Sequence, residues 1–292
     1  METTVLNLPD GFKIECNIIF GCTEEGLFHI KLHRPKKKNA LSRDMYHKLH
    51  DLLVYANKLE EARVVLVYGA NGDFCAGNDM QDFLNREPEC PVRMNNLMMA
   101  FATLEKPLYF FIQGCSVGIT ATYVTHADFA YCSEDAFFYT PFMSLTLVPE
   151  GLSSIKFPEF MGRRKANEVL YTDQRVTAQV ALESRFINGI IKKVDLPNTE
   201  SIITEIDKLP LLRKLLNGDP KTVQNAKRLL IQAQPMARYQ AHNLLEQRNV
   251  QASELAPGFK DHVRKYMSKN VKQSKPKQQT TKNSNNEERA KL

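Results

Sequence analysis

The chain has 292 residues, 43% of them hydrophobic, which is enough to bury a sizeable core in one large domain or two small ones. No apolar run reaches the ~20 residues of a membrane helix, and the N-terminus carries no apolar signal region, so we expect neither a membrane partner nor a secretory signal. The net charge of +6 arises in residues 260–292, where ten basic residues accompany three acidic ones; residues 1–259 carry −1, so no nucleic-acid-binding face is expected on the core.

Strand patterns recur along the first part of the chain. They are K-I-E-C-N-I-I-F (13–20), L-F-H-I-K-L (27–32), V-V-L-V-Y-G (64–69), L-Y-F-F-I-Q-G (108–114), F-A-Y-C-S (129–133), F-F-Y-T-P (137–141) and I-N-G-I-I-K-K-V (187–194). Helical spacing lies between them, most clearly over 43–59, with Ser42 as the expected N-cap. This alternation predicts an α/β core over residues 1–210.

Metal sites are not expected. The six cysteines form no C-x-x-C pair, which excludes a zinc ribbon and a dithiol redox motif. His29 and His33 alternate with apolar residues in G-L-F-H-I-K-L-H, a pattern typical of a strand rather than of metal ligands.

The C-terminal part of the sequence is helical. Apolar residues recur at helical spacing over 222–233, 238–255 and 259–267, which predicts a helical subdomain over 211–267. Residues 268–292 contain almost no apolar side chains, so they predict a disordered basic tail. The last three residues, Ala290-Lys291-Leu292, resemble the small-basic-leucine address read by peroxisomal import receptors. We therefore expect such a receptor as a partner and a peroxisomal location.

Two glycine-containing turns each follow a predicted strand. In Y-G-A-N-G-D-F-C-A-G-N-D-M (68–80) and in Q-G-C-S-V-G-I-T-A (113–121), a strand exit leads into a helix and exposes backbone amides. Two such amides could converge on one carbonyl oxygen as an oxyanion hole. The simpler interpretation of the first turn is a strand-to-helix connection capped by Asp79.

Glu150 is the single carboxylate in an otherwise uncharged segment, residues 136–155. Apolar neighbours such as Phe142, Leu147, Val148 and Leu152 would desolvate it, raising its pKa and making it a better proton shuttle. The alternative is that Glu150 only caps the helix that begins at S-S-I (153–155), or faces water.

A family resemblance follows from the order of five motifs. These are H-R-P-K-K-K-N-A-L-S (33–42), D-F-C-A-G-N-D-M (73–80), K-P-L-Y-F-F-I-Q-G-C-S-V-G (106–118), L-V-P-E-G-L-S-S (147–154) and M-G-R-R-K-A-N-E-V-L (161–170). Together they resemble the crotonase, or enoyl-CoA hydratase/isomerase, superfamily over about 12–194. The P-E-G-x-S-S neighbourhood and the A-K-L end are most similar to peroxisomal Δ3,Δ2-enoyl-CoA isomerases. The resemblance implies a crotonase-type spiral of ββα units with a C-terminal helical trimerisation subdomain, forming homotrimers or hexamers.

The resemblance also implies binding residues, carried over motif by motif. The oxyanion-hole amides would be those of Asn78 and Ile119. Coenzyme A, which is part of the substrate and not a separate cofactor, would lie against Lys36, Lys38, Ala40, Ala76, Gly77, Asn78, Asp79 and Met80. For the lysines, a solvated turn after Pro35 is the alternative.

The resemblance further implies one acid/base residue. The two positions that hold the hydratase glutamates are here Thr122 and Phe142, which carry no carboxylate, whereas Glu150 matches the acid/base of the isomerase branch. The implied reaction moves the double bond of 3-enoyl-CoA to C2 through a dienolate, in the β-oxidation of unsaturated fatty acids. The alternatives are a thioester hydrolase in which Glu150 activates water, and a non-catalytic acyl-CoA sensor or scaffold. Whether 84–92 lines an acyl tunnel or acts as a lid stays open.

Overall fold

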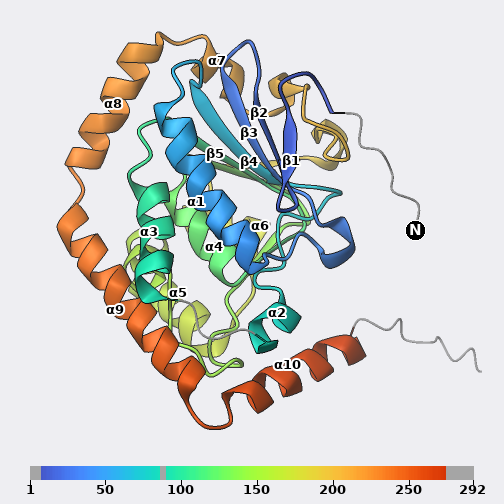
Figure 1. The fold of residues 1–292 in the computed structure, drawn as a ribbon, viewed down its shortest axis with the longest axis vertical. Helices are drawn as coiled ribbons and strands as arrows, with labels where there is room; N and C mark the ends of the chain where they lie inside the picture. The colour runs from blue at the N-terminus through green and yellow to red at the C-terminus, as the bar shows by residue number, and fades with distance from the viewer. Residues whose placement is uncertain (1–7, 86–89, 274–292) are drawn as a thin grey trace, which may run out of the picture.

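Figure 1 shows the fold in a computed structural model, which describes residues 8–85 and 90–273. The main sheet has the spatial order β1-β2-β3-β4-β5-β7-β10. Its strands are β1 (Lys13–Glu15), β2 (Ile18–Cys22), β3 (Leu27–Leu32), β4 (Val64–Gly69), β5 (Leu108–Ile112), β7 (Phe129–Ser133) and β10 (Gly189–Ile191). The first three strands are antiparallel, and β3 to β10 are parallel. The predicted alternation of strands and helices is confirmed.

The segment 13–20 is a hairpin and not the single strand expected from its sequence. Cys16 and Asn17 adopt left-handed backbone angles, φ 48° and 58°, and form the two-residue turn between β1 and β2. Two successive residues at positive φ match the twist of a tight hairpin. The apolar pattern did not reveal this turn because it contains no glycine.

The central strands β3, β4 and β5 of the main sheet are buried on both faces. Val65 and Val67 of β4 belong to the core shared with α1 (Arg43–Lys58) and α3 (Pro91–Ala102). Leu66 of the same strand belongs to a second core, formed with η4 (Ile206–Lys208) and α7 (Leu212–Leu216). Burial on both sides explains why these strands are continuous apolar runs.

A small second sheet lies beside the main one and positions the second turn. It consists of β6 (Cys115–Val117), β8 (Phe137–Tyr139) and β9 (Val176–Thr177), in the order β6-β8-β9. The short strands β6 and β9 were not predicted. Strand β6 leads directly through Gly118 into α4 (Ile119–Tyr123).

The remaining helices connect the strands or cover the sheet. They are η1 (Pro35–Lys37), α2 (Met80–Asn85), η2 (Val124–His126), α5 (Ser153–Thr172), α6 (Ala178–Glu183) and η3 (Lys193–Asp195). Ser42 is the N-cap residue of α1, as predicted, but its side chain makes no capping hydrogen bond. Instead, the Asp82 side chain accepts a hydrogen bond from the Arg43 backbone N–H at 3.0 Å.

The predicted C-terminal helices are present as α8 (Pro220–Gln232), α9 (Met236–Leu255) and α10 (Phe259–Gln273), which form an arc around one side of the molecule (Figure 1). Helix α10 continues to Gln273, beyond residue 268, where the sequence predicted the tail to begin. Lysine and glutamine are good helix formers even without apolar neighbours. The rest of the expected tail, including Ala290 to Leu292, and residues 86–89 of the 84–92 segment lie outside the described residues.

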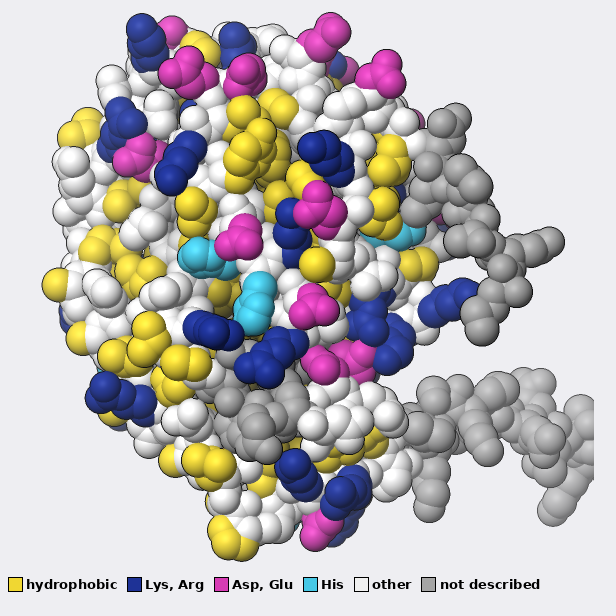
Figure 2. Space-filling model, viewed as in Figure 1, with side chains coloured by type: hydrophobic (Ala, Val, Ile, Leu, Met, Phe, Trp, Pro, Cys, Tyr) yellow, Lys and Arg dark blue, Asp and Glu magenta, His cyan; other side chains and the backbone are white. Residues whose placement is uncertain are grey.

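The surface of the described region mixes charges of both signs. Figure 2 shows Lys and Arg side chains interspersed with Asp and Glu over one face of the molecule. None of the helices described in 8–85 and 90–273 combines the length and the apolar character needed to cross a membrane.

Candidate active site

The two turns predicted from the sequence belong to a network of loops that Asn39 holds together. Asn39 is fully buried; its side chain accepts from the Arg34 N–H at 2.9 Å and donates to the Ala70 and Asp73 carbonyls at 2.9 and 2.7 Å. The Ala76 N–H donates to the Lys38 carbonyl at 2.9 Å. The segment 34–41 is thereby fastened to the first turn.

The two turns themselves lie side by side. The Cys75 backbone N–H donates to the Cys115 carbonyl at 2.8 Å, and the Cys75 carbonyl accepts from the Val117 N–H at 3.0 Å. A Cβ on Gly77 would lie 2.6 Å from the Val117 oxygen, and Gly77 has φ 82°. We expected the small residues Ala76 and Gly77 to admit another molecule, but at Gly77 the close approach is made by the second turn of the same chain.

The backbone amides of Asn78 and Ile119 are oriented away from the bonds that join the loops. Leu41 pairs with the Gly77 carbonyl and the Asp79 N–H, so the intervening Asn78 N–H is not used in this bridge. Ile119 is the first residue of α4, where an N–H has no partner within the helix. Within the described part of the chain, neither amide donates a hydrogen bond.

Glu150 lies in the same cavity as Asn78, and the residue that follows it contacts the second turn. The Glu150 side chain is buried, with 7% exposed. The following residue, Gly151, has φ 67°, and a Cβ there would clash with the Thr122 hydroxyl and lie 3.3 Å from Ile119 Cδ1. The structure therefore brings together Glu150, Asn78 and Ile119, which are distant in the sequence.

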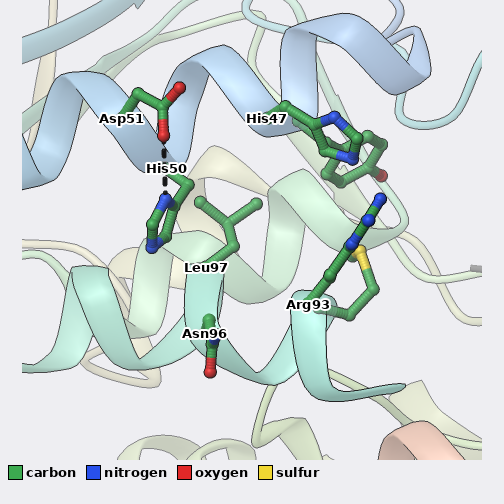
Figure 3. A pocket seen from close by; sticks show the side chains of 8 residues that line it. His47, His50, Asp51, Arg93, Asn96 and Leu97 are labelled. Atoms are coloured by element: carbon green, nitrogen blue, oxygen red, sulfur yellow. Dashed lines mark hydrogen bonds and ion pairs between the residues drawn. The ribbon is translucent and has the colours of Figure 1, made fainter. Parts of the chain in front are cut away.

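The cavity is narrow and continues toward a larger cleft. Its free volume is about 20 Å³, roughly the room for one water molecule. Tyr46 and Met94 also line a cleft of about 340 Å³ between α1 and α3. Figure 3 shows His47 and His50 on one side of this cleft and Arg93 and Asn96 on the other, with His50 bonded to Asp51 at 3.1 Å.

Helix α9 contacts the Glu150 loop through two adjacent residues. Gln247 donates to Glu150 Oε2 at 3.4 Å. Glu246 accepts from the backbone N–H groups of Leu152 at 2.7 Å and Ser154 at 3.2 Å, and from the Ser154 hydroxyl. These are the amides of the N-cap residue and of the second residue of α5, so Glu246 provides the cap for which Glu150 was the alternative candidate.

Burial strongly desolvates the titratable side chains around Glu150. The pKa of Glu246 is raised from 4.5 to about 7. Burial is the main cause and the neighbouring Glu150 charge adds to it, while the hydrogen bonds that Glu246 accepts act in the opposite direction. Burial also raises the pKa of the Tyr123 hydroxyl well above 10, with contributions from Tyr46 and Glu150. Tyr46 donates to Asn78 Oδ1.

The residues expected to bind coenzyme A cluster on the two fastened loops. Lys36 and Lys38 are exposed, and Lys38 lies 3.2 Å from the Asp73 carboxylate. The Asp79 carboxylate is already paired with Arg34 at 2.8 Å and Lys37 at 2.7 Å, and these interactions lower its pKa. Asp79 therefore joins the loops through its side chain.

The other expected positions in this cluster differ in burial. Ala40 is buried, and its carbonyl accepts from Arg34 at 2.7 Å. Ala76 and Met80 are half-buried and adjoin Asn78 in the first turn. In the part of the chain that the structure describes, no group of three His, Cys, Asp or Glu side chains is placed to hold a metal ion.

Comparison with known proteins identifies the family. A family model described as enoyl-CoA hydratase/isomerase matches residues 22–281. The chain belongs to this family. Enoyl-CoA delta isomerase 2 of Homo sapiens is 36% identical over 177 residues, 58% of this chain and 44% of that protein. Enoyl-CoA delta isomerase 3, peroxisomal, of Mus musculus is 32% identical over 188 residues, 62% of this chain and 57% of that protein. The chain thus spans about half the length of these curated relatives.

Solved structures confirm the fold class. The crystal structure of an enoyl-CoA hydratase/isomerase from Pseudoalteromonas atlantica T6c superposes with a TM-score of 0.75 at 25% identity, covering 87% of this chain and 97% of that one. The resemblance to the crotonase superfamily is therefore confirmed, with the likeness to enoyl-CoA isomerases.

Two positions were expected from the resemblance to lack the hydratase glutamates. Thr122 and Phe142, which by the resemblance replace the hydratase glutamates, are both buried, and the Thr122 hydroxyl donates to the Ile119 carbonyl at 2.7 Å. Neither side chain carries a carboxylate that could position and split water.

Sequence reasoning missed several residues of the site. Tyr46, Gln247 and Glu254 line the cavity, and Glu246 lies behind it. Their helical segments were recognised, but helical spacing does not show which part of the core a face contacts. The polar residues in the segment that forms α9 were the signal that the sequence offered.

Proposed function

We propose that this chain is an isomerase that converts 3-enoyl-CoA into 2-enoyl-CoA, with Glu150 as its acid/base. One observation carries the proposal: Glu150 is buried in a cavity that Asn78 also lines, and the adjacent Gly151 packs against Ile119. The isomerase names of the relatives at 32–36% identity support it.

In the proposed reaction, Glu150 removes a proton from C2 of the substrate. The electron pair of that C–H bond shifts toward the thioester carbonyl, giving a dienolate. Glu150 then returns the proton to C4, so the double bond moves from C3 to C2 without net gain or loss of protons. One carboxylate suffices because both carbons present the same face.

The dienolate needs stabilisation of its oxygen, which the amides of Asn78 and Ile119 would provide. A positioned donor in an oxyanion hole is worth about 3 kcal/mol of barrier lowering, so two account for several kcal/mol. Because the Gly77 contact with Val117 fixes the distance between the two turns, both amides would be in place before the substrate binds.

Coenzyme A would bind on the outer side of the same loops. Lys36 and Lys38 are exposed cations suited to phosphates, and Ala40, Ala76, Gly77, Asn78, Asp79 and Met80 would contact adenine and pantetheine. No cofactor beyond this part of the substrate is needed. The free volume beside Glu150 is too small for an acyl chain, so we place the chain's far end in the cleft between α1 and α3.

Assembly and location are further parts of the proposal. We propose a homotrimer or hexamer, to be tested by sedimentation of the purified protein. We also propose peroxisomal import through Ala290-Lys291-Leu292; the peroxisomal location in the name of the mouse relative supports it. Adding one residue after Leu292 should scatter a fluorescent fusion into the cytosol, and continued import would refute the address.

The decisive assay follows conjugated 2-enoyl thioester by ultraviolet absorbance while free thiol is measured in parallel. Isomerisation predicts conjugation without thiol release, and thiol release alone would favour a hydrolase. A second carboxylate in the cavity, Glu254, makes this control necessary because two carboxylates can activate water. Glu254→Gln should retain isomerase activity.

A further inference from the structure

The buried face of α9 is polar. Its buried residues are Tyr239, Asn243, Glu246, Gln247 and Val250. A helix packed on a core normally presents an apolar stripe, because burying polar groups is costly unless each is hydrogen-bonded. The helix packs along α3 and the start of α5 (Figure 1). The burial of these polar residues therefore requires an explanation, which their contacts provide.

Glu246 acts as the N-terminal cap of a different helix. It is 6% exposed and accepts from the Leu152 and Ser154 amides and from the Ser154 hydroxyl. The first amides of an α-helix have no partners within the helix and attract a carboxylate. Helix α5 is thus capped by a side chain from α9.

This cap has a consequence for Glu150, which precedes the N-cap residue Leu152 by two positions. A carboxylate this close to a helix N-terminus is attracted to its free amides. In that orientation Glu150 would leave the cavity and its pKa would fall, because amide hydrogen bonds favour the charged form. Glu246 occupies the amides, and the adjacent Gln247 donates to Glu150.

We propose that Glu246 is a positioning residue that occupies the N-terminal amides of α5 and so keeps the Glu150 carboxylate in the cavity, where Gln247 holds one oxygen. This inference rests on the proposed function of Glu150 as acid/base. It makes the C-terminal helical region of the chain a part of its own active site, in addition to any role in assembly.

The two carboxylates also interact electrostatically. Their mutual repulsion is one reason for the raised pKa of Glu246, about 7. Other titratable groups face this pair from each neighbouring element of the described structure: Tyr46 of α1, Tyr123 of α4, His126 of η2, Lys156 of α5, and His242 and Glu254 of α9. Removing the Glu246 charge therefore lowers the Glu150 pKa by itself, and a test must separate this effect from reorientation.

The test compares Glu246→Ala, which frees the amides, with Glu246→Gln, which retains an acceptor. The Glu150 pKa is measured without substrate by ¹³C NMR of the labelled carboxyl groups, assigned with Glu150→Gln. Both variants remove the Glu246 charge, so the comparison between them isolates reorientation: Glu246→Ala should show a Glu150 pKa about one unit or more below that in Glu246→Gln. Glu246→Ala should also lower kcat by about tenfold or more, with KM little changed. Glu246→Gln should keep kcat within about threefold of the wild type.

Asp219→Ala is the matched control, because Asp219 caps α8 by accepting from the Thr222 N–H at 2.8 Å. It removes a helix cap but should leave the Glu150 pKa and kcat unchanged. If folded Glu246→Ala shows the same Glu150 pKa as Glu246→Gln, the proposal is overturned. If the pKa is lower in Glu246→Ala but the wild type shows no isomerase activity, the positioning role stands and the proposed function fails.

If Glu246→Ala does not fold, Gln247→Met provides an alternative test. It keeps a long side chain and removes the donor to Glu150, so the Glu150 pKa should rise and kcat should fall. An unchanged pKa and kcat in this variant would overturn the role of α9 in positioning Glu150.

Discussion

The buried carboxylate of Glu246 should make the protein less stable as pH rises, the opposite of a carboxylate whose pKa is lowered on folding. Its pKa is raised from 4.5 to about 7, so the folded state holds its proton more tightly than the unfolded state. The stabilising contribution is complete below pH 4.5 and is lost as pH rises through 7. The difference of about 2.5 units corresponds to about 3 kcal/mol.

Replacing Glu246 with glutamine removes this titration and keeps the size of the side chain. The free energy of unfolding of wild type minus that of Glu246→Gln should therefore decrease by about 3 kcal/mol between pH 4.5 and pH 8. Urea unfolding at a series of pH values measures this difference, in which the contributions of titrating groups that do not interact with Glu246 cancel. A difference that is constant across this range would refute the reasoning.

Three further predictions follow from particular contacts. Gly77→Ala should destabilise the protein by about 1–3 kcal/mol from backbone strain alone and by more from the clash with Val117; Gly72→Ala, also at positive φ but with open space around it, is the control in thermal unfolding. Burial lowers the pKa of His126 to about 4, so about 3 kcal/mol should be lost as pH falls from 6.5 to 4; an acid limb of the same depth in His126→Gln would contradict this. Asn96→Trp should fill the cleft between α1 and α3 and lower kcat/KM for long acyl chains by about tenfold. The kcat/KM for short chains should stay near wild type, as should both values in the control Val92→Trp, at an exposed position of α3. Equal losses for all chain lengths would exclude the cleft as the acyl site.

The elements of the fold were largely predictable because burial on both faces gives the central strands of the main sheet an unbroken apolar pattern. The hairpin at Cys16 and Asn17 was not, since neither residue signals a turn as glycine does. The short strands β6 and β9 were missed because two or three residues carry too little pattern to recognise.

The candidate site was predictable only where it is local in sequence. The two turns and Glu150 stand out by composition, and the structure brings them together. The cap from Glu246 joins residues 94 and 92 positions apart, and the sequence of α9 does not show which of its faces meets Glu150. Asn39 was missed for the same reason, because its partners Ala70 and Asp73 lie beyond a helix and a strand.

The central claim is that Glu150 moves the proton. Its most direct test is turnover of 3-enoyl-CoA by Glu150→Gln, which keeps the size and the polar character of the side chain, together with a measurement of acyl-CoA affinity. Turnover should fall by about 10²–10⁴-fold, the usual contribution of a general acid/base, while the dissociation constant changes little. Turnover close to that of the wild type would contradict the account.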